Sequence, residues 1–294
     1  MTGEFGGRDG NQTLDYCLGE LRRADRDRYL TLLFAPRAAR PLLAALYAFN
    51  LECARAVVAG GEQPLLGQMR LQWWRDALEG GAAGGGAAGQ AHPVLTSLLA
   101  RPDRLSDMLP GLRCILAARE RDLTDPPFAT LGDVLAQARD TGGALVALAA
   151  GILADDDTAT AAARAAGTAY ALAGMLRAIP FQAPGAGFQG RLCLPLDVLA
   201  RHGAAADQVW SGEQPAAVAA CVAEVAAAAN DELATLANDR PKGAAIAPLL
   251  HGSLARAYLR RLARAVHDPF APDLGLNPLS RPLMLCWRAL LHRP

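Results

Sequence analysis

Apolar residues recur at the three- and four-residue spacing of α-helices along almost the whole chain, whereas the strict alternation typical of β-strands is scarce. Leu14, Leu18 and Leu21 form such a stripe among charged residues, and this pattern predicts an amphipathic helix over Leu14–Tyr29. By the same criterion we expect further helices over Leu42–Val58, Leu65–Leu78, His92–Leu99, Pro110–Leu123, Leu131–Leu153, Thr158–Ile179, Pro195–His202, Pro215–Ala237, Ala244–His267 and Arg281–His292.

Glycine and proline mark the breaks between these helices. Gly80–Gln90 is almost entirely glycine and alanine, which is typical of a flexible loop. Pro180 is expected to end the helix before it, because proline lacks a backbone N–H. The chain has no internal repeat and no shift in composition. We therefore predict one all-α domain over residues 13–294, preceded by a disordered, polar N-terminus over residues 1–12.

Composition narrows the classes of function. Apolar residues make up 52% of the 294 residues, enough for a large core, and 29 basic residues balance 29 acidic ones, so a nucleic-acid partner is not expected. The longest apolar stretch, Gly142–Ala154, is too short to cross a bilayer, and the N-terminus lacks the apolar run of a signal peptide. We expect a cytoplasmic protein with at most peripheral membrane contact. No cysteine pair has metal-ligand spacing, which indicates free thiols.

Several carboxylates are candidates for a metal site, but each has a simpler interpretation. The run Asp155–Asp157 is typical of a turn that caps the following helix. Asp25 and Asp27 are two positions apart, so they do not share a helix face, and they alternate with arginines as a solvated surface does. Asp122 follows the charged run Arg119–Arg121, which favours a surface ion pair, and Asp140 completes this set of candidates.

The aromatic pair Trp73 and Trp74 is a candidate ligand platform. Adjacent helical positions point about 100° apart, so we expect one ring in the core and the other near a groove. The histidines are scattered and have no nucleophile beside them. No dinucleotide or serine-hydrolase motif is present.

Six segments, in order, resemble motifs of the squalene/phytoene synthase family. Leu46–Phe49 is similar to its "LYAF" segment, Leu71–Leu78 to its "AWWRDEL" helix and His92–Val94 to its "HPV" segment. The later matches are Arg119–Leu123, ending in "DL" at Asp122, the positions of "GxAxQLTNILRD" from Gly167 to Arg177, and Gly190–Asp197, which fits "GRxYLPxD". Tyr47, Arg191 and Asp197 are thus family-matching positions. The resemblance implies an all-α isoprenoid synthase-like bundle around a central cavity.

In that family, two aspartate-rich segments face each other across the cavity and hold Mg²⁺, which binds and ionises a prenyl diphosphate. Here the first segment, "DDxxD", falls on Ala54–Val58 and contains no carboxylate. Arg55 would place a positive charge where Mg²⁺ should lie, unless its side chain points away, in which case the repulsion is removed but no ligand is supplied. The second, "NILRDxxED", falls on Gly174–Gln182 and retains only Arg177. The altered positions that we expect to line the cavity are Ala54, Arg55, Val58, Gly174, Arg177, Ala178, Phe181 and Gln182.

These replacements favour a protein that is not a catalyst, with no metal and no cofactor. Asp25–Pro36 and Arg70–Leu78 look most like the family's degenerate branch of complex I assembly factors and its bacterial relatives, which implies a partner in a respiratory complex and a place at the inner membrane face. One alternative is an active enzyme that joins two prenyl diphosphates through an atypical Mg²⁺ site. The other is a carrier of an isoprenoid-like ligand or a quinone tail, unless the cavity has collapsed.

Overall fold

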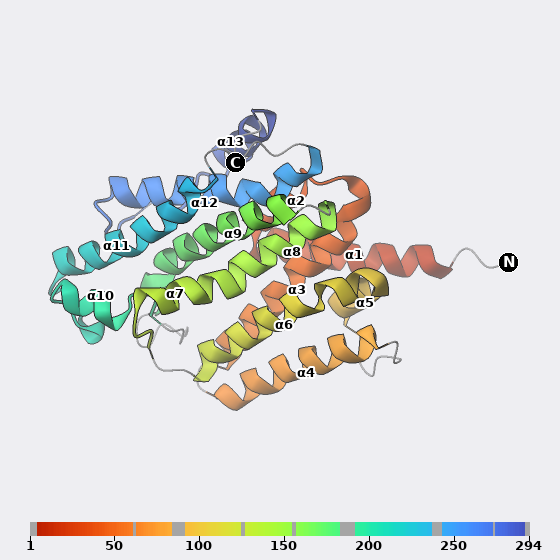
Figure 1. The fold of residues 1–294 in the computed structure, drawn as a ribbon, viewed down its shortest axis with the longest axis horizontal. Coiled ribbons are helices and arrows are strands. Elements are labelled where there is room, and N and C mark those ends of the chain that lie inside the picture. Colours follow the sequence, from red (N-terminus) through yellow and green to blue (C-terminus); the bar gives the residue numbers. More distant parts are fainter. Residues whose placement is uncertain are drawn as a thin grey trace.

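The computed structural model describes residues 5–60, 63–83, 92–124, 127–154, 157–182, 192–236, 243–272 and 274–291, and within them it is helical without any strand (Figure 1). The α-helices are α1 Phe5–Ala24, α2 Arg26–Leu32, α3 Arg40–Ala59, α4 Pro64–Ala82, α5 Pro93–Leu99, α6 Pro102–Thr124, α7 Leu131–Ala138, α8 Ala144–Leu153, α9 Asp157–Ala178, α10 Leu196–Arg201, α11 Pro215–Ala234, α12 Ile246–Arg264 and α13 Ser280–Leu290.

The first predicted helix is two helices. α1 begins at Phe5, so residues 5–12 are helical where disorder was expected, and it ends at Ala24. Asp25 then leaves helical geometry and its side chain accepts a hydrogen bond from the backbone N–H of Arg28, 3.2 Å away, as an N-cap does. The cap starts α2 in a new direction, which hydrophobic spacing alone does not reveal.

Helix α6 also begins earlier than predicted. It starts at Pro102 and continues through Pro110, where the sequence indicated a beginning. Proline lowers helix stability at an interior position. The helix persists because Leu105, Met108 and Leu112, on both sides of Pro110, are buried in the core. The other helix ends lie within a few residues of those predicted, and α9 stops at Ala178 before Pro180, as expected.

A π-helical segment, Arg139–Gly143, joins α7 to α8 inside the predicted helix Leu131–Leu153. Gly142 lies directly against Gly167 of α9. A Cβ atom on Gly142 would approach the carbonyl oxygen of Gly167 to 2.6 Å, and one on Gly167 would approach that of Gly142 to 2.2 Å. Both glycines are required for this close contact between backbones, and the π segment widens the helix beside the cavity.

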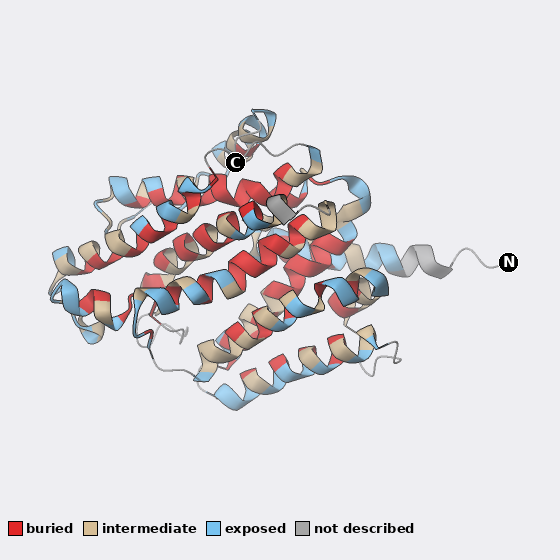
Figure 2. Ribbon diagram, viewed as in Figure 1, coloured by how far each residue is buried: buried red, intermediate tan, exposed pale blue. Residues whose placement is uncertain are grey.

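Buried residues lie on the inward faces of the helices (Figure 2), and they form two groups in the core. One surrounds α9, α11 and α12, and the other surrounds α1, α3, α5 and α6. The stretch Arg37–Ala59, which contains α3, is long and apolar enough to cross a membrane by length and composition. It is 67% buried inside the bundle, however, as the core helix of a globular protein is.

Candidate functional site

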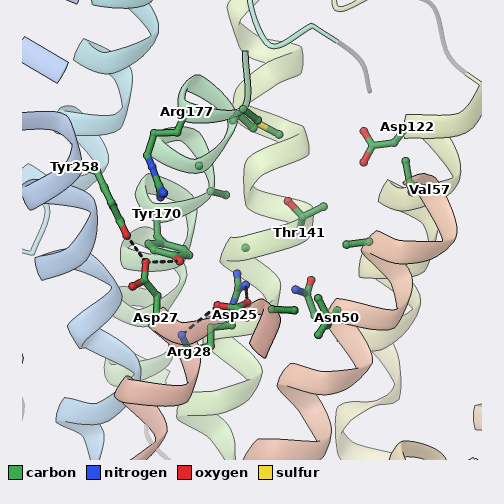
Figure 3. Close-up of a pocket in the computed structure, with 18 of the residues that line it drawn as sticks. Asp25, Asp27, Arg28, Asn50, Val57, Asp122, Thr141, Tyr170, Arg177 and Tyr258 are labelled. Carbon is green, nitrogen blue, oxygen red and sulfur yellow. Dashed lines mark hydrogen bonds and ion pairs between the residues drawn. The ribbon is translucent and has the colours of Figure 1, made fainter. Parts of the chain in front are cut away.

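A cavity of about 490 Å³ opens between α2, α3, α6, α9 and α12 (Figure 3). Asn50, Leu51 and Ala54 line it from α3, and Tyr170 and Gly174 line it from α9. The two segments that were expected to face each other therefore do so. The cavity has not collapsed, so that alternative is wrong.

Only some of the altered motif positions line this cavity. Ala54, Gly174, Arg177, Ala178 and Gln182 do. The other three, Arg55, Val58 and Phe181, are not among its lining residues, and both Val58 and Phe181 are exposed. Val57 lines the cavity in place of Val58, and the short 3₁₀ turn after Ala178 leaves Phe181 in solvent.

Arg55 is turned away from the cavity. Its guanidinium forms ion pairs with Glu20 at 2.5 Å and Glu52 at 2.7 Å. Arg55 directly follows Ala54, so its side chain leaves α3 about 100° around the helix axis. Of the two expected orientations, Arg55 therefore takes the one that removes the repulsion with a metal in the cavity, and it supplies no ligand.

The carboxylate of Asp27 is hydrogen-bonded to three side chains in the cavity. It accepts hydrogen bonds from the hydroxyls of Tyr170 at 3.0 Å and Tyr258 at 2.6 Å, and from the guanidinium of Arg281 at 2.8 Å. The Asp27 side chain is 7% exposed. Through these bonds one residue of α2 links α9, α12 and α13. The expectation of a solvated surface at Asp27 is therefore wrong.

Asp25 also lies in the cavity wall, where it forms an ion pair with Arg28. The argument that Asp25 and Asp27 cannot share a helix face fails, because Asp25 is the N-cap and lies outside the helical geometry of α2. Burial opposes the charge on Arg28, but the Asp25 carboxylate outweighs it and raises the pKa of Arg28 above its usual value.

Asp122 lies on the opposite side of the cavity, beside Val57 (Figure 3). It forms an ion pair with Arg119 at 3.1 Å and accepts a hydrogen bond from the side-chain amide of Gln137 at 2.8 Å. The predicted ion pair exists, but it is largely buried rather than on the surface. Asp140 pairs with Arg121 at 2.6 Å and is not a lining residue.

Burial shifts the titration of the groups behind Asp27. It raises the pKa of Tyr170 and of Tyr258, and the nearby Asp27 carboxylate adds to both shifts. It also lowers the pKa of His251 to about 4, with a further contribution from Arg28. His251 is therefore a neutral core residue, with Nδ1 donating to the carbonyl of Pro248 at 2.8 Å.

The net charge of the cavity is positive. The guanidinium of Arg177 lies over the ring of Tyr258, 3.7 Å from its centroid, a favourable cation–π contact. The charged lining residues comprise five arginines and three aspartates, a net formal charge of +2: Arg26, Arg28, Arg119, Arg177, Arg281, Asp25, Asp27 and Asp122.

The remaining predicted residues lie elsewhere. Tyr47 is buried behind the cavity wall with its ring edge-on to His251. Asp197 pairs with Arg201 of α10 at 3.2 Å, outside the cavity. Arg191, like Asp155 and Asp156, lies outside the described residues. Trp74 is buried and Trp73 is partly exposed beside two shallow grooves, so the predicted split between core and groove is confirmed.

The carboxylates that line the cavity do not fit a magnesium site. Mg²⁺ requires an octahedral set of oxygen ligands. Asp25, Asp27 and Asp122 instead each accept hydrogen bonds from an arginine, and Asp27 from two tyrosines as well. Within the described part of the chain, no three histidine, cysteine or carboxylate side chains are grouped so that they could hold a metal.

Comparison with known proteins places this geometry in a family. The family described as squalene/phytoene synthase matches residues 21–287. This chain belongs to that family. Its fold is similar to a dehydrosqualene synthase in complex with a ligand, with a TM-score of 0.76 and 15% identity over 96% of this chain and 98% of that one. It also resembles squalene synthase HpnC from Alicyclobacillus acidocaldarius, with a TM-score of 0.71 and 20% identity over 89% and 97%.

Curated relatives of this family member carry a different name. The chain is 30% identical to the Drosophila melanogaster homolog of complex I assembly factor 6, over 95% of this chain and 84% of the relative. It is 27% identical to the Homo sapiens assembly factor 6, over 93% and 81%. The predicted resemblance to the assembly factor branch is thus confirmed.

Sequence reasoning missed the central role of Asp27 and its partners Tyr170, Tyr258 and Arg281. One signal was available, because Asp27 lies in the segment Asp25–Pro36, which itself pointed to the assembly factor branch. Nothing in the local pattern connected that segment to residues more than 140 positions away.

Proposed function

We propose that this synthase-family protein does not catalyse prenyl transfer and takes part in assembling a respiratory complex, as the names of its relatives suggest for them. One observation carries the proposal. Ala54, Gly174 and Ala178 present no carboxylate to the cavity, and each aspartate that does line it is bonded to an arginine. Under this proposal the cavity offers no free carboxylate to bind the metal ions that would ionise a prenyl diphosphate.

It follows that the protein uses neither a metal nor a cofactor. Mg²⁺ would be bound only if the chain were an active transferase with a rebuilt metal site. Such a site would require Asp27 to give up its hydrogen bonds to Tyr170, Tyr258 and Arg281. We place the protein in the cytoplasm, peripheral to the inner membrane face, where a partner in a respiratory complex would be reached.

A second candidate function is ligand binding, favoured by the open cavity of about 490 Å³. Leu51, Val57 and Met175 supply apolar wall, while Arg177 and the net positive charge suit a polar or anionic head. An isoprenoid-like or quinone-like amphiphile matches this combination. A ligand that binds only the folded state raises the melting temperature, so a panel of prenyl alcohols and quinones tests the candidate directly.

The catalytic question has a direct experiment. The purified protein is incubated with farnesyl or geranylgeranyl diphosphate and Mg²⁺, and the products are extracted. We expect no hydrocarbon product and no diphosphate release. Formation of squalene- or phytoene-type products at a rate proportional to enzyme would refute the proposal.

The assembly role needs a cellular measurement. Deleting the gene in the source organism should lower the amount of assembled respiratory complex I on native gels, and the wild-type gene should restore it. Complex I at full abundance in the deletion strain would contradict the assembly role without affecting the conclusion about catalysis.

A further inference from the structure

Helix α13 has an apolar face that no described part of the chain covers. Leu279, Leu283, Trp287 and Leu290 are 82%, 71%, 63% and 76% exposed. Leu279 is the N-cap of α13 and the other three lie within the helix, and their spacing of four, four and three residues places all four on one side. Isolated exposed apolar residues are ordinary, but four in one stripe with a tryptophan among them indicate an interaction surface.

The opposite face of α13 is fixed to the bundle. Leu285 is fully buried against the core. Arg281 reaches into the cavity, where it pairs with Asp27 at 2.8 Å and donates to the carbonyl of Leu276 at 2.8 Å. These contacts hold the helix in one orientation, so the apolar stripe stays directed toward solvent (Figure 1, the helix labelled α13 at the edge of the molecule).

The charged side chains within α12 and α13 are all basic, and the exposed Asp268 follows α12 in the connecting segment. α12 carries Arg256, Arg260, Arg261 and Arg264, and α13 adds Arg288. The other arginine of α13, Arg281, is paired with Asp27 inside the cavity and does not contribute to this surface. Burial lowers the pKa of Arg256, and the positive charges of Arg288 and Arg260 lower it further. Arginines of the two helices therefore lie close enough to repel one another, and an anionic surface would relieve that repulsion.

We propose that α13 and the neighbouring arginines of α12 form a surface that docks on an anionic lipid bilayer. Leucine and tryptophan side chains enter the boundary between headgroups and acyl chains, while arginines contact the lipid phosphates. A helix with an apolar stripe, a tryptophan and only positive charges matches a lipid surface better than a protein surface of mixed charge. The inference rests on α13 itself and holds whether or not the proposed assembly role is correct.

Flotation with lipid vesicles tests the surface. The full-length protein is mixed with vesicles of phosphatidylcholine alone, or with about one third phosphatidylglycerol, at low salt. We expect binding to the anionic vesicles that weakens as salt increases. The double variant Leu283→Gln/Trp287→Gln should bind these vesicles with an affinity reduced at least about tenfold. Its matched control is Leu65→Gln/Met69→Gln on α4, which removes side chains 66% and 60% exposed from another face and should bind as the wild type does.

A second readout does not depend on the folding of the double variant. Trp287 fluorescence should be quenched by vesicles whose acyl chains carry bromine, and the variant Trp287→Phe should bind yet lose that quenching. Absence of wild-type binding to anionic vesicles at low salt would overturn the proposal, as would equal losses in the α13 and α4 variants. A concentration-dependent dimer that Leu283→Gln/Trp287→Gln abolishes, without lipid binding, would show that a second copy covers the stripe.

Discussion

At the scale of single residues, the cavity is organised around one buried carboxylate. Asp27 gathers two hydroxyls and a guanidinium from three helices. A buried ionised group is tolerated only when it is paired and hydrogen-bonded. Asp25, Asp27 and Asp122 are each already paired with an arginine of the same cavity. Their ion pairs and hydrogen bonds therefore hold the surrounding helices together.

Removing this carboxylate should destabilise the protein strongly. Asp27→Ala leaves the Arg281 charge and two tyrosine hydroxyls without their acceptor, and we expect a loss of about 3–5 kcal/mol in the free energy of unfolding. Denaturant titration measures it. Asp103→Ala is the control and should have a much smaller effect, because it removes only an exposed pair with Arg101 and a carboxylate in the first turn of α6. Equal stabilities for the two variants would show that the Asp27 network is not structural.

His251 should make the stability depend on pH. Its pKa is about 4 in the fold and near 6.5 when unfolded, so the unfolded state binds more protons between these values. Stability attributable to neutral His251 is therefore present above about pH 6.5 and is lost as the pH falls toward 4, by on the order of 3 kcal/mol.

The variant His251→Phe cannot titrate at this position. We expect its free energy of unfolding to change less between pH 7 and pH 4 than that of the wild type, measured by urea unfolding at each pH. Parallel pH profiles for the two proteins would contradict the assignment of His251 as a neutral buried group.

At the scale of elements, the packing of α9 against the π segment fixes the shape of the cavity wall. Gly142 and Gly167 bring the two backbones together. Gly142 itself lines the cavity, as do the nearby residues Thr141 and Tyr170. A side chain at either glycine would separate the elements. Gly174 lies about two turns farther along α9, and a Cβ atom added there would have no neighbour within 4 Å.

This difference yields opposite effects for the same substitution on one helix. Gly167→Ala should destabilise the protein by about 1–3 kcal/mol, because the new methyl group collides with the backbone of Gly142. Gly174→Ala should stabilise it by about 0.5–1 kcal/mol, since alanine is the better helix former and meets no neighbour. Thermal unfolding of both variants gives the comparison, and a stable Gly167→Ala protein would refute the close packing.

At the scale of the whole molecule, the bundle has the fold of the squalene/phytoene synthase family and encloses a cavity of net positive charge. Five arginines outnumber three aspartates around it. A cavity of this charge attracts anions directly and repels divalent cations. The fold is thus shared with solved synthases, while the charge of this cavity favours anions over divalent cations.

Metal dependence is the measurable consequence. Calorimetry with a non-hydrolysable prenyl diphosphate analogue should give the same affinity, or the same absence of binding, with and without millimolar Mg²⁺. An active squalene synthase run in parallel is the positive control. Binding that requires Mg²⁺ at micromolar affinity would contradict the prediction and restore the transferase alternative.

Much of the architecture followed from the chain alone. Helical periodicity placed the helices because the spacing of apolar residues reflects a local geometry, and proline marked the end of α9 for the same reason. The absence of carboxylates at Ala54, Gly174 and Ala178 was likewise readable, because motif order fixed the alignment. The break at Asp25 was not, since an aspartate cap within the charged run of residues 22–28 cannot be told from the other charged positions of a helix surface.

Only the tertiary structure decided which charges face the cavity and which face is uncovered. Helix geometry gives the angle between the side chains of Ala54 and Arg55 on α3, but the sequence does not show which of the two faces the cavity. It cannot pair Asp27 with Tyr258, 231 positions away, or reveal that α13 buries Leu285 and leaves Trp287 in solvent. The sequence determined the local elements because their causes are local, whereas burial and pairing depend on how those elements pack together.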